Sequence, residues 1–255
     1  YLLMNLKQHL YLATIDPNSA SLARKFDLGL EICQFCTAMN MDDKNFSVWD
    51  QQVKEQLTQT SRAIFHGPFN ELHPSAIDPL ALALAKYRFK QAAQLAATYG
   101  IHKLVLHSGY VPHMYMDIWF IDRSIEFWQE FIRTQPDHFS LYIENIQESN
   151  PDVLREIIQG INDTRVKLCL DIGHAHVFSK LSPAEWVNRL GAAIGHVHLH
   201  NNDGINDHHW PLNQGTIDIK EFLTCLSEKS PNATITLENS VCEDSIQWLT
   251  QQHYL

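Results

Sequence analysis

The sequence has few of the features that mark exported or membrane proteins. Its five cysteines are an odd and scattered set, whereas a secreted disulfide framework has an even number at regular spacing. No apolar run approaches the roughly 20 residues of a membrane-spanning helix. The start of the chain, YLLMNLKQHLYLAT, lacks the charged segment and long apolar stretch of a secretion signal. We therefore expect a cytoplasmic protein without membrane contacts.

Positive charge is also scarce. The chain has 19 Lys and Arg residues against 29 Asp and Glu residues, and its formal net charge is −10 at pH 7. Duplex DNA is bound mainly through Lys and Arg that displace its counterions, so this balance disfavours nucleic acid as a partner without excluding it. The sequence carries no signal for an oligomeric state.

Cysteine contributes little to a predicted metal site. Cys33 and Cys36 form a CxxC, but no second CxxC follows, so the pair falls short of a zinc-binding pattern. We interpret Cys33 as a buried strand residue and Cys36 as incidental.

The chain does contain a regular alternation of two kinds of segment. With 255 residues, 45% of them hydrophobic, it is long enough for one barrel or for two small domains. Short β-branched runs alternate with amphipathic segments, as expected for βα units around a parallel sheet. We predict an α/β fold, a (β/α)8 TIM barrel, as a single domain over residues 1–255. The eight predicted strands lie in residues 9–15, 28–35, 62–69, 103–109, 140–146, 166–173, 194–201 and 233–240.

Helix-like segments lie between these runs. Several begin with Asp, Asn or Ser followed by proline, the combination of an N-cap and a first-turn proline. No linker, low-complexity stretch or shift in composition divides the chain, which favours the single barrel. The predicted helices include residues 47–60, 79–100, 151–161 and 182–191.

Fifteen histidines are more than a chain of this size needs for packing, and several of them end a predicted strand. In a barrel the carboxyl ends of all strands meet on one face, where the active sites of this fold lie. Residues far apart in sequence would therefore become neighbours there. The candidate metal ligands at six successive strand ends are His66, His107, Glu144, Asp171, His198 and Glu238.

Two loops add candidates. His174 follows Asp171 by three residues, and Asp207 and His209 lie two apart. Imidazole and carboxylate ligands together suit zinc, manganese or iron rather than calcium. We expect one to three divalent ions, zinc or manganese, and Glu144 could bridge two of them.

A plainer interpretation applies to each residue taken alone, because a single strand histidine is more often a satisfied core residue than a ligand. The carboxylates Glu144, Asp171 and Glu238 are harder to explain that way, since burying an unpaired charge is costly. The prediction rests on the coincidence across six strands.

Some neighbouring histidines compete for the same role. His196, His198 and His200 alternate on one strand and point to the same side. We choose His198 as the ligand, place His196 deeper in the barrel, and expect His200 to support a ligand or to face substrate. His176 and His208 are alternatives to the ligands His174 and His209.

These residues resemble the xylose isomerase-like barrel superfamily, which joins sugar isomerases and epimerases with AP endonucleases of the endonuclease IV type, AP endonuclease family 2. The similarity covers nearly the whole chain. The matching motifs are the HGP turn at 66–68, the DxxH of Asp171 and His174, and HLHNNDGxxDxH from His198 to His209.

The resemblance implies two ligand schemes. In the endonuclease branch nine residues hold three zinc ions, and all nine positions match here in residue type. In the epimerase branch Glu144, Asp171, His198 and Glu238 hold one manganese-type ion, and the two glutamates also move protons. The nine positions are His66, His107, Glu144, Asp171, His174, His198, Asp207, His209 and Glu238.

The chain departs from the superfamily pattern at two places. Asn213 and Gln214 stand where many relatives carry Gly-Glu, so a carboxylate that supports the ligands is missing. After His66 the chain reads Gly-Pro-Phe-Asn, without the Asp-containing run and the tyrosine that invades the base stack in DNA-cutting relatives. Phe69 keeps only the aromatic character.

Three functions follow from these observations. The leading hypothesis is a metal-dependent isomerase or epimerase of a sugar or sugar phosphate, in which Glu144 and Glu238 act as general acids and bases. A hydrolase of phosphoesters with a trinuclear zinc site is the alternative, because isomerisation does not need five of the nine ligands. A metal-binding protein without catalysis is a third hypothesis.

The predicted partner is a small molecule whose identity the ligands do not specify. His200, Phe69 and Tyr110 are the candidates for contact with it. A phosphate group would need a nearby cation, for which we consider Lys180 and Arg123.

Overall fold

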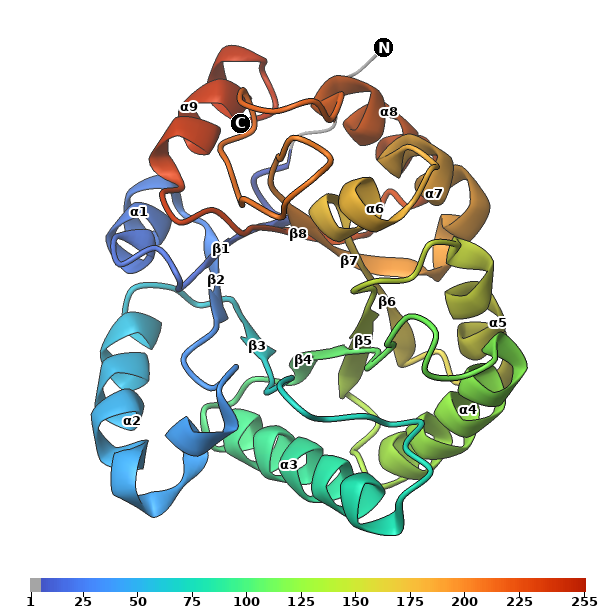
Figure 1. The fold of residues 1–255 in the computed structure, drawn as a ribbon. Coiled ribbons are helices and arrows are strands. Elements are labelled where there is room, and N and C mark those ends of the chain that lie inside the picture. Colours follow the sequence, from blue (N-terminus) through green and yellow to red (C-terminus); the bar gives the residue numbers. More distant parts are fainter. Residues whose placement is uncertain (1–5) are drawn as a thin grey trace.

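Eight parallel strands form a closed barrel in the computed structural model, which describes residues 6–255 (Figure 1). Residues 1–5, the beginning of the stretch in which we expect no secretion signal, lie outside the described residues. All eight predicted strands are confirmed, and so is the predicted TIM barrel. The strands are β1 Leu10–Ala13, β2 Gly29–Ile32, β3 Ala63–His66, β4 Lys103–His107, β5 Ser140–Glu144, β6 Val166–Asp171, β7 Ile194–Leu199 and β8 Thr234–Leu237.

The strands pair in chain order, and the pairing of β8 with β1 closes the barrel. The register places His107 beside Glu144 and Asp171 beside His198. Two pairs of predicted ligands are therefore brought together by the backbone alone.

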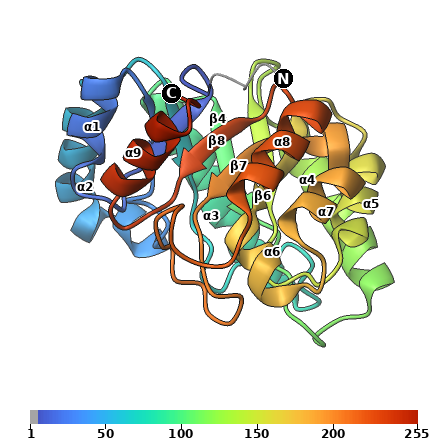
Figure 2. The same cartoon turned by 90° about the horizontal axis from the view of Figure 1, so that it is seen from above.

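Helices surround the barrel and alternate with the strands along the chain (Figure 1). Figure 2 shows α6 and the segment after β7 projecting from one end of the barrel, while the C-terminus lies at the other end. Two short 3-10 helices, η1 Ala38–Met41 and η2 Gly191–Ala193, complete the elements. The α-helices are α1 Ser19–Phe26, α2 Asp43–Leu57, α3 Pro79–Thr98, α4 Asp117–Arg133, α5 Pro151–Ile161, α6 Ile172–Phe178, α7 Pro183–Leu190, α8 Ile219–Lys229 and α9 Glu243–Gln251.

Three helices begin as the sequence predicts. Asp78, Asn150 and Ser182 each cap a helix with the side chain, accepting a backbone N–H of the first turn, and each precedes a proline. At Ser182 the side chain of Glu185 completes a capping box. These caps fix where α3, α5 and α7 begin.

Apolar side chains fill two regions of the molecule. The larger lies between the strands and the helices, because every second strand residue points outward. The smaller closes the barrel interior away from its carboxyl end, and above it the inward positions become polar. The interior apolar cluster consists of Tyr11, Ile64, Val105, Tyr142 and Cys169.

The next inward positions on the same strands carry the predicted ligands. On β3, β4, β5 and β6, the residue two places after the apolar cluster is His66, His107, Glu144 or Asp171. The period of two along a strand thus places an apolar floor beneath a polar layer. Within residues 6–255 no helix is long and apolar enough to cross a membrane.

Candidate metal centre

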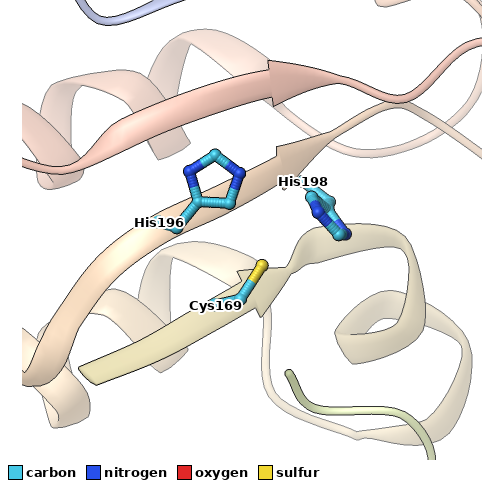
Figure 3. A group of neighbouring side chains, drawn as sticks. All are labelled: Cys169, His196 and His198. Atoms are coloured by element: carbon cyan, nitrogen blue, oxygen red, sulfur yellow. The ribbon is translucent and has the colours of Figure 1, made fainter. Parts of the chain in front are cut away.

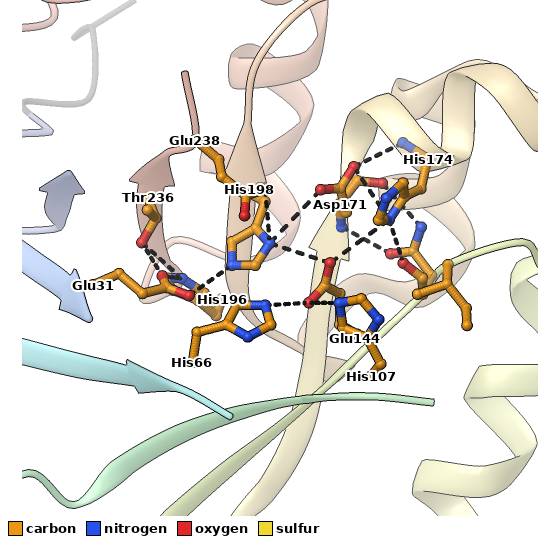
Figure 4. A network of polar contacts seen from close by, with 12 residues as sticks. Glu31, His66, His107, Glu144, Asp171, His174, His196, His198, Thr236 and Glu238 are labelled. Atoms are coloured by element: carbon orange, nitrogen blue, oxygen red, sulfur yellow. Dashed lines mark hydrogen bonds and ion pairs between the residues drawn. The ribbon is translucent and has the colours of Figure 1, made fainter. Parts of the chain in front are cut away.

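Glu144, at the end of β5, lies at the centre of the polar layer (Figure 4). Its Oε2 lies 3.1 Å from Nε2 of His66 and 3.3 Å from Nε2 of His107. Its Oε1 lies 3.3 Å from Nδ1 of His198 and 3.6 Å from Nδ1 of His174. One carboxylate on β5 therefore approaches four histidines, from β3, β4, β7 and α6, the arrangement expected of a bridging ligand.

A second group surrounds His198 on β7. Its Nδ1 lies 3.3 Å from Glu144, 3.4 Å from Oε2 of Glu238 and 3.7 Å from Oδ2 of Asp171. This nitrogen is buried and has no hydrogen-bond partner. Three carboxylates around a buried, unpartnered nitrogen make a donor set suited to a divalent cation.

A third group is built by the loop after β7. Asp207 Oδ2 lies 2.9 Å from Nε2 of His209 and 3.3 Å from Nε2 of His174. The other oxygen of Asp207 is buried without a hydrogen-bond partner. The backbone of His209 is left-handed, with φ of 52°, and its Nδ1 hydrogen-bonds the carbonyl of Glu238 at 2.7 Å.

Local structure explains the spacing of these residues. Asp171 ends β6 and also caps α6, accepting the backbone N–H of His174 at 2.7 Å. The cap turns His174 back over the barrel mouth. In the loop after β7, paired backbone hydrogen bonds between Asn201 and Trp210 fold the segment that carries Asp207 and His209 into a hairpin-like turn.

The structure brings all nine predicted ligands to the carboxyl end of the barrel, in the three groups described above. Their function as ligands remains a prediction. The two alternative histidines have contacts outside these groups. His176 hydrogen-bonds Thr216, and His208 stacks on Trp210 with ring centroids 4.2 Å apart. The preference for His174 and His209 over these two neighbours agrees with the geometry.

His200 is completely buried and hydrogen-bonds Asp171, one of the predicted ligands. Its Nε2 lies 3.2 Å from both oxygens of Asp171, and its ring stacks on His209 with centroids 4.0 Å apart. It does not belong to the cavity lining. Of the two roles expected for His200, the structure therefore favours support of a ligand over contact with substrate.

The charged side chains of the site shift one another's pKa. Burial alone would raise the pKa of Glu144, but the nearby His107 and His198 hold it well below its usual range. The pKa of Asp171 is likewise held low by His174 and His200 against the effect of burial. Burial opposes protonation of His66, yet its contact with Glu144 raises the His66 pKa to about 10. The pKa values of the acids and of His66 thus move in opposite directions, as expected when groups of opposite charge pair.

A cavity of about 460 Å³ opens above the ligands and is of a size that holds a small molecule. Phe69 is part of its wall, and Tyr110 lines the adjoining part of the mouth. No Lys or Arg of residues 6–255 lines either part. Lys180 is exposed, and Arg123 pairs with Glu126 beside a different pocket, so neither supplies the cation considered for a phosphate group.

The interpretation of Cys33 as a buried strand residue is wrong. Cys33 lies beyond the end of β2, is only half-buried, and lines the cavity together with Cys36. The strand ends at Ile32, three residues before the predicted end at residue 35, since Cys36 N–H bonds the carbonyl of Cys33 in a tight turn. Both cysteines are free thiols.

Cys169, His196 and His198 form another close group, with two histidines on β7 and the cysteine on β6 (Figure 3). The nitrogens of His196 already bond Thr234 and Glu31, at 2.7 and 3.0 Å. His196 lies deep in the barrel, as expected. With its nitrogens engaged, this trio is better explained as barrel packing than as a separate ion site.

Glu31 on β2 is a polar residue of the site that sequence reasoning missed. It is fully buried, and its carboxylate contacts His196, His198 and Thr236. Burial would raise its pKa, but His198 and His196 hold the pKa well below its usual range. The available signal was a lone acid inside the apolar run LGLEI, where an unpaired charge is costly.

A model of the family described as the xylose isomerase-like TIM barrel matches residues 22–252. Among curated proteins, the uncharacterized protein MJ1311 of Methanocaldococcus jannaschii is 27% identical over 196 residues. That match covers 72% of this chain and 66% of the relative, slightly less than two thirds of its length.

Two solved structures illustrate the similarity of fold. A D-tagatose 3-epimerase-like protein superposes with a TM-score of 0.77 and 22% identity, over 97% of each chain. The IolI protein, solved with a binding zinc atom, gives a TM-score of 0.74 and 17% identity over 96% of each chain.

Proposed function

Because the chain belongs to the xylose isomerase-like TIM barrel family, we propose that it is a divalent-metal-dependent isomerase or epimerase of a small carbohydrate. Family membership and the epimerase-like neighbour support a function of the sugar isomerase or epimerase type. The metal dependence and the reaction are our proposal.

One observation carries the proposal: the unpartnered Nδ1 of His198 lies 3.3 to 3.7 Å from carboxylates of Glu144, Asp171 and Glu238. The set of three carboxylates and one imidazole fits a single zinc- or manganese-type ion. The zinc atom of the IolI protein supports a divalent ion in a barrel of this kind.

An ion held there would polarise the carbonyl group of a bound sugar. Glu144 and Glu238 both line the cavity, and they reach it from β5 and from the end of β8. One carboxylate would remove the proton next to the carbonyl, and the other would return a proton to the opposite face or to the neighbouring carbon. The first outcome is epimerisation and the second isomerisation.

The lining favours an uncharged sugar over a sugar phosphate when one ion is bound. Four carboxylates, those of Glu144, Asp171, Asp207 and Glu238, lie at the site, and no Lys or Arg of the described residues lines the cavity. One divalent ion offsets only part of the charge of these carboxylates, and the lining offers no Lys or Arg to bind a phosphate group.

The test uses purified protein loaded with manganese or zinc and a panel of aldoses and ketoses in deuterated water. We expect deuterium to appear at a carbon next to the carbonyl of at least one sugar, as measured by proton NMR. Glu238→Gln should abolish this exchange while leaving the fold intact. No exchange into any sugar of the panel, with the ion bound, would contradict the proposal.

A second candidate is phosphoester hydrolysis, which is favoured by the group of His174, Asp207 and His209. An isomerase does not require these contacts of 3.3 and 2.9 Å to Asp207. Three ions would reverse the charge of the site and make a phosphate group acceptable, and closely spaced ions can hold both oxygens of a displacement.

Metal analysis separates the two candidates. About one ion per chain supports the isomerase, and about three zinc ions support the hydrolase. The zinc-saturated protein is then assayed with an abasic-site DNA duplex and with a small phosphodiester. Cleavage of either one would replace the proposed isomerase by a hydrolase.

A further inference from the structure

The carboxylate of Glu31 lies directly beneath the candidate metal centre. Its Oε1 accepts a hydrogen bond from Nε2 of His198 at 3.0 Å, and its Oε2 accepts one from Nε2 of His196, also at 3.0 Å. The hydroxyl of Thr236 donates to the same Oε2. Figure 4 shows these groups on the side of His198 that faces away from Glu144.

The surroundings of Glu31 hold it in place. His196 is anchored by the hydroxyl of Thr234, 2.7 Å from its Nδ1, and its ring stacks on Tyr142 with centroids 5.4 Å apart. All of these side chains are buried. A buried carboxylate is costly unless it is paired and hydrogen-bonded. The three donors around Glu31 meet this requirement and fix the position of its carboxylate.

The hydrogen bond to Glu31 determines which nitrogen of His198 carries the proton. With Nε2–H donated to Glu31, the ring can offer a lone pair only from Nδ1, and Nδ1 is the nitrogen that faces Glu144, Asp171 and Glu238. Histidine ligands commonly donate their second N–H to a carboxylate, which fixes the ring and strengthens the ligand.

We propose that Glu31 is a positioning residue that keeps the proton of His198 on Nε2 and so presents Nδ1 to a divalent ion. The inference rests on the proposed function only in that an ion binds near His198. It adds a role for β2, a strand that contributes none of the nine predicted ligands.

A first experiment uses the unsubstituted protein loaded with cadmium-113 and labelled with nitrogen-15 at histidine. We expect coupling between cadmium and Nδ1 of His198, and a slowly exchanging proton on its Nε2. Coupling to Nε2, or a proton on Nδ1, would overturn the proposal. The measurement needs no substitution, so it does not depend on whether a variant folds.

A second experiment compares Glu31→Gln with Asp16→Asn. Asp16 is also a buried carboxylate, but it accepts two backbone N–H groups, those of Asn18 and Cys242, and does not contact a predicted ligand. We expect Glu31→Gln to weaken zinc binding about 10- to 100-fold, measured by competition with a chromophoric chelator. Asp16→Asn should change zinc affinity less than about threefold, whatever it does to thermal stability.

If Glu31→Gln lowers stability but keeps the affinity and the cadmium coupling of the unsubstituted protein, Glu31 is only a structural residue and the inference fails. This result leaves the proposed function standing. Failure of the unsubstituted protein to bind an ion would instead contradict the proposed function.

Discussion

The ring of Phe69 lies flat against the imidazole of His107, with ring centroids 4.3 Å apart and 6° between the planes. The same ring meets His66 edge-on, at 6.0 Å. Phe69 therefore touches both histidines that approach Oε2 of Glu144, while one of its sides borders the cavity. These contacts indicate that Phe69 fixes the two rings, a role that was not expected from the sequence; contact with substrate, the role that was expected, stays a prediction.

We predict that Phe69→Ala weakens binding of the ion near His66 and His107. Loss of an aromatic pair of this kind costs about 0.5–1.5 kcal/mol, or roughly 2- to 10-fold in affinity. Zinc titration by calorimetry measures the effect. Tyr110→Ala is the matched control, because Tyr110 lines the mouth but its ring packs on Phe120. Equal affinities in the two variants would show that Phe69 does not order the histidines.

Glu144→Gln should remove bound metal more completely than any other single substitution at the site. Each oxygen of Glu144 lies near two histidines, and a carboxamide keeps one acceptor while losing the charge. We expect at least one ion fewer per chain, measured by elemental analysis after gel filtration.

Glu148→Gln provides the control for that substitution. Glu148 is also buried, four residues later, but it bonds Ser108 and the backbone of Ile146, and burial raises its pKa. Its substitution should leave metal content unchanged. Equal metal loss in both variants would indicate general damage to the barrel mouth.

Most of the fold was predictable because the period of two along each strand and the caps of several helices are local features. Even the first strand, which has the weakest pattern, is present as β1. The ends of strands were less certain: the apolar run after Glu31 suggests that Cys33 continues β2, but a turn forms there instead.

The candidate ligands were predictable for a different reason, since a barrel brings all strand ends together whatever the loops do. Glu31 could not be found by the same rule, because it lies within β2 and not at its end. Its role depends on a contact with His198 that spans 167 residues of sequence, and no local pattern encodes such a pairing.

Thermal stability of the metal-free protein should fall between pH 6.5 and about 10. Contact with Asp207 and Glu238 raises the pKa of His209 to about 10 against the effect of burial, as Glu144 does for His66. For both histidines the pKa in the folded protein lies above the ordinary value of 6.5 that applies to the unfolded chain. The stability that this difference contributes is complete below pH 6.5 and is lost as the pH rises toward 10.

A bound ion should stabilise the protein more at high pH than at low pH. It replaces the protons of the histidines, so the increase in melting temperature caused by saturating zinc should grow from pH 6.5 to pH 9. Differential scanning calorimetry with EDTA or with zinc measures both curves. A metal-free protein whose melting temperature rises over this range would contradict the assigned pairs.

Gly173 should not tolerate a side chain. A Cβ at this position would lie 2.0 Å from Cε1 of His200. His200 cannot move aside easily, because it bonds Asp171 and stacks on His209 at 4.0 Å. Gly173 lies in α6, where alanine is intrinsically the better helix former, so any loss in Gly173→Ala comes from the clash.

We expect Gly173→Ala to destabilise the protein by about 1–3 kcal/mol, the usual cost of overpacking a filled interior. It should also lower metal content, since the displaced ring pushes on Asp171 and His209. Gly160→Ala is the control: Gly160 lies in α5, and its added Cβ would lie 2.3 Å from Cδ1 and 2.9 Å from Cγ1 of Ile125, a half-buried side chain that is not part of the site. Urea unfolding and elemental analysis of both variants decide the matter. If Gly173→Ala matches Gly160→Ala in stability and metal content, His200 is not the rigid support of Asp171 that its contacts indicate.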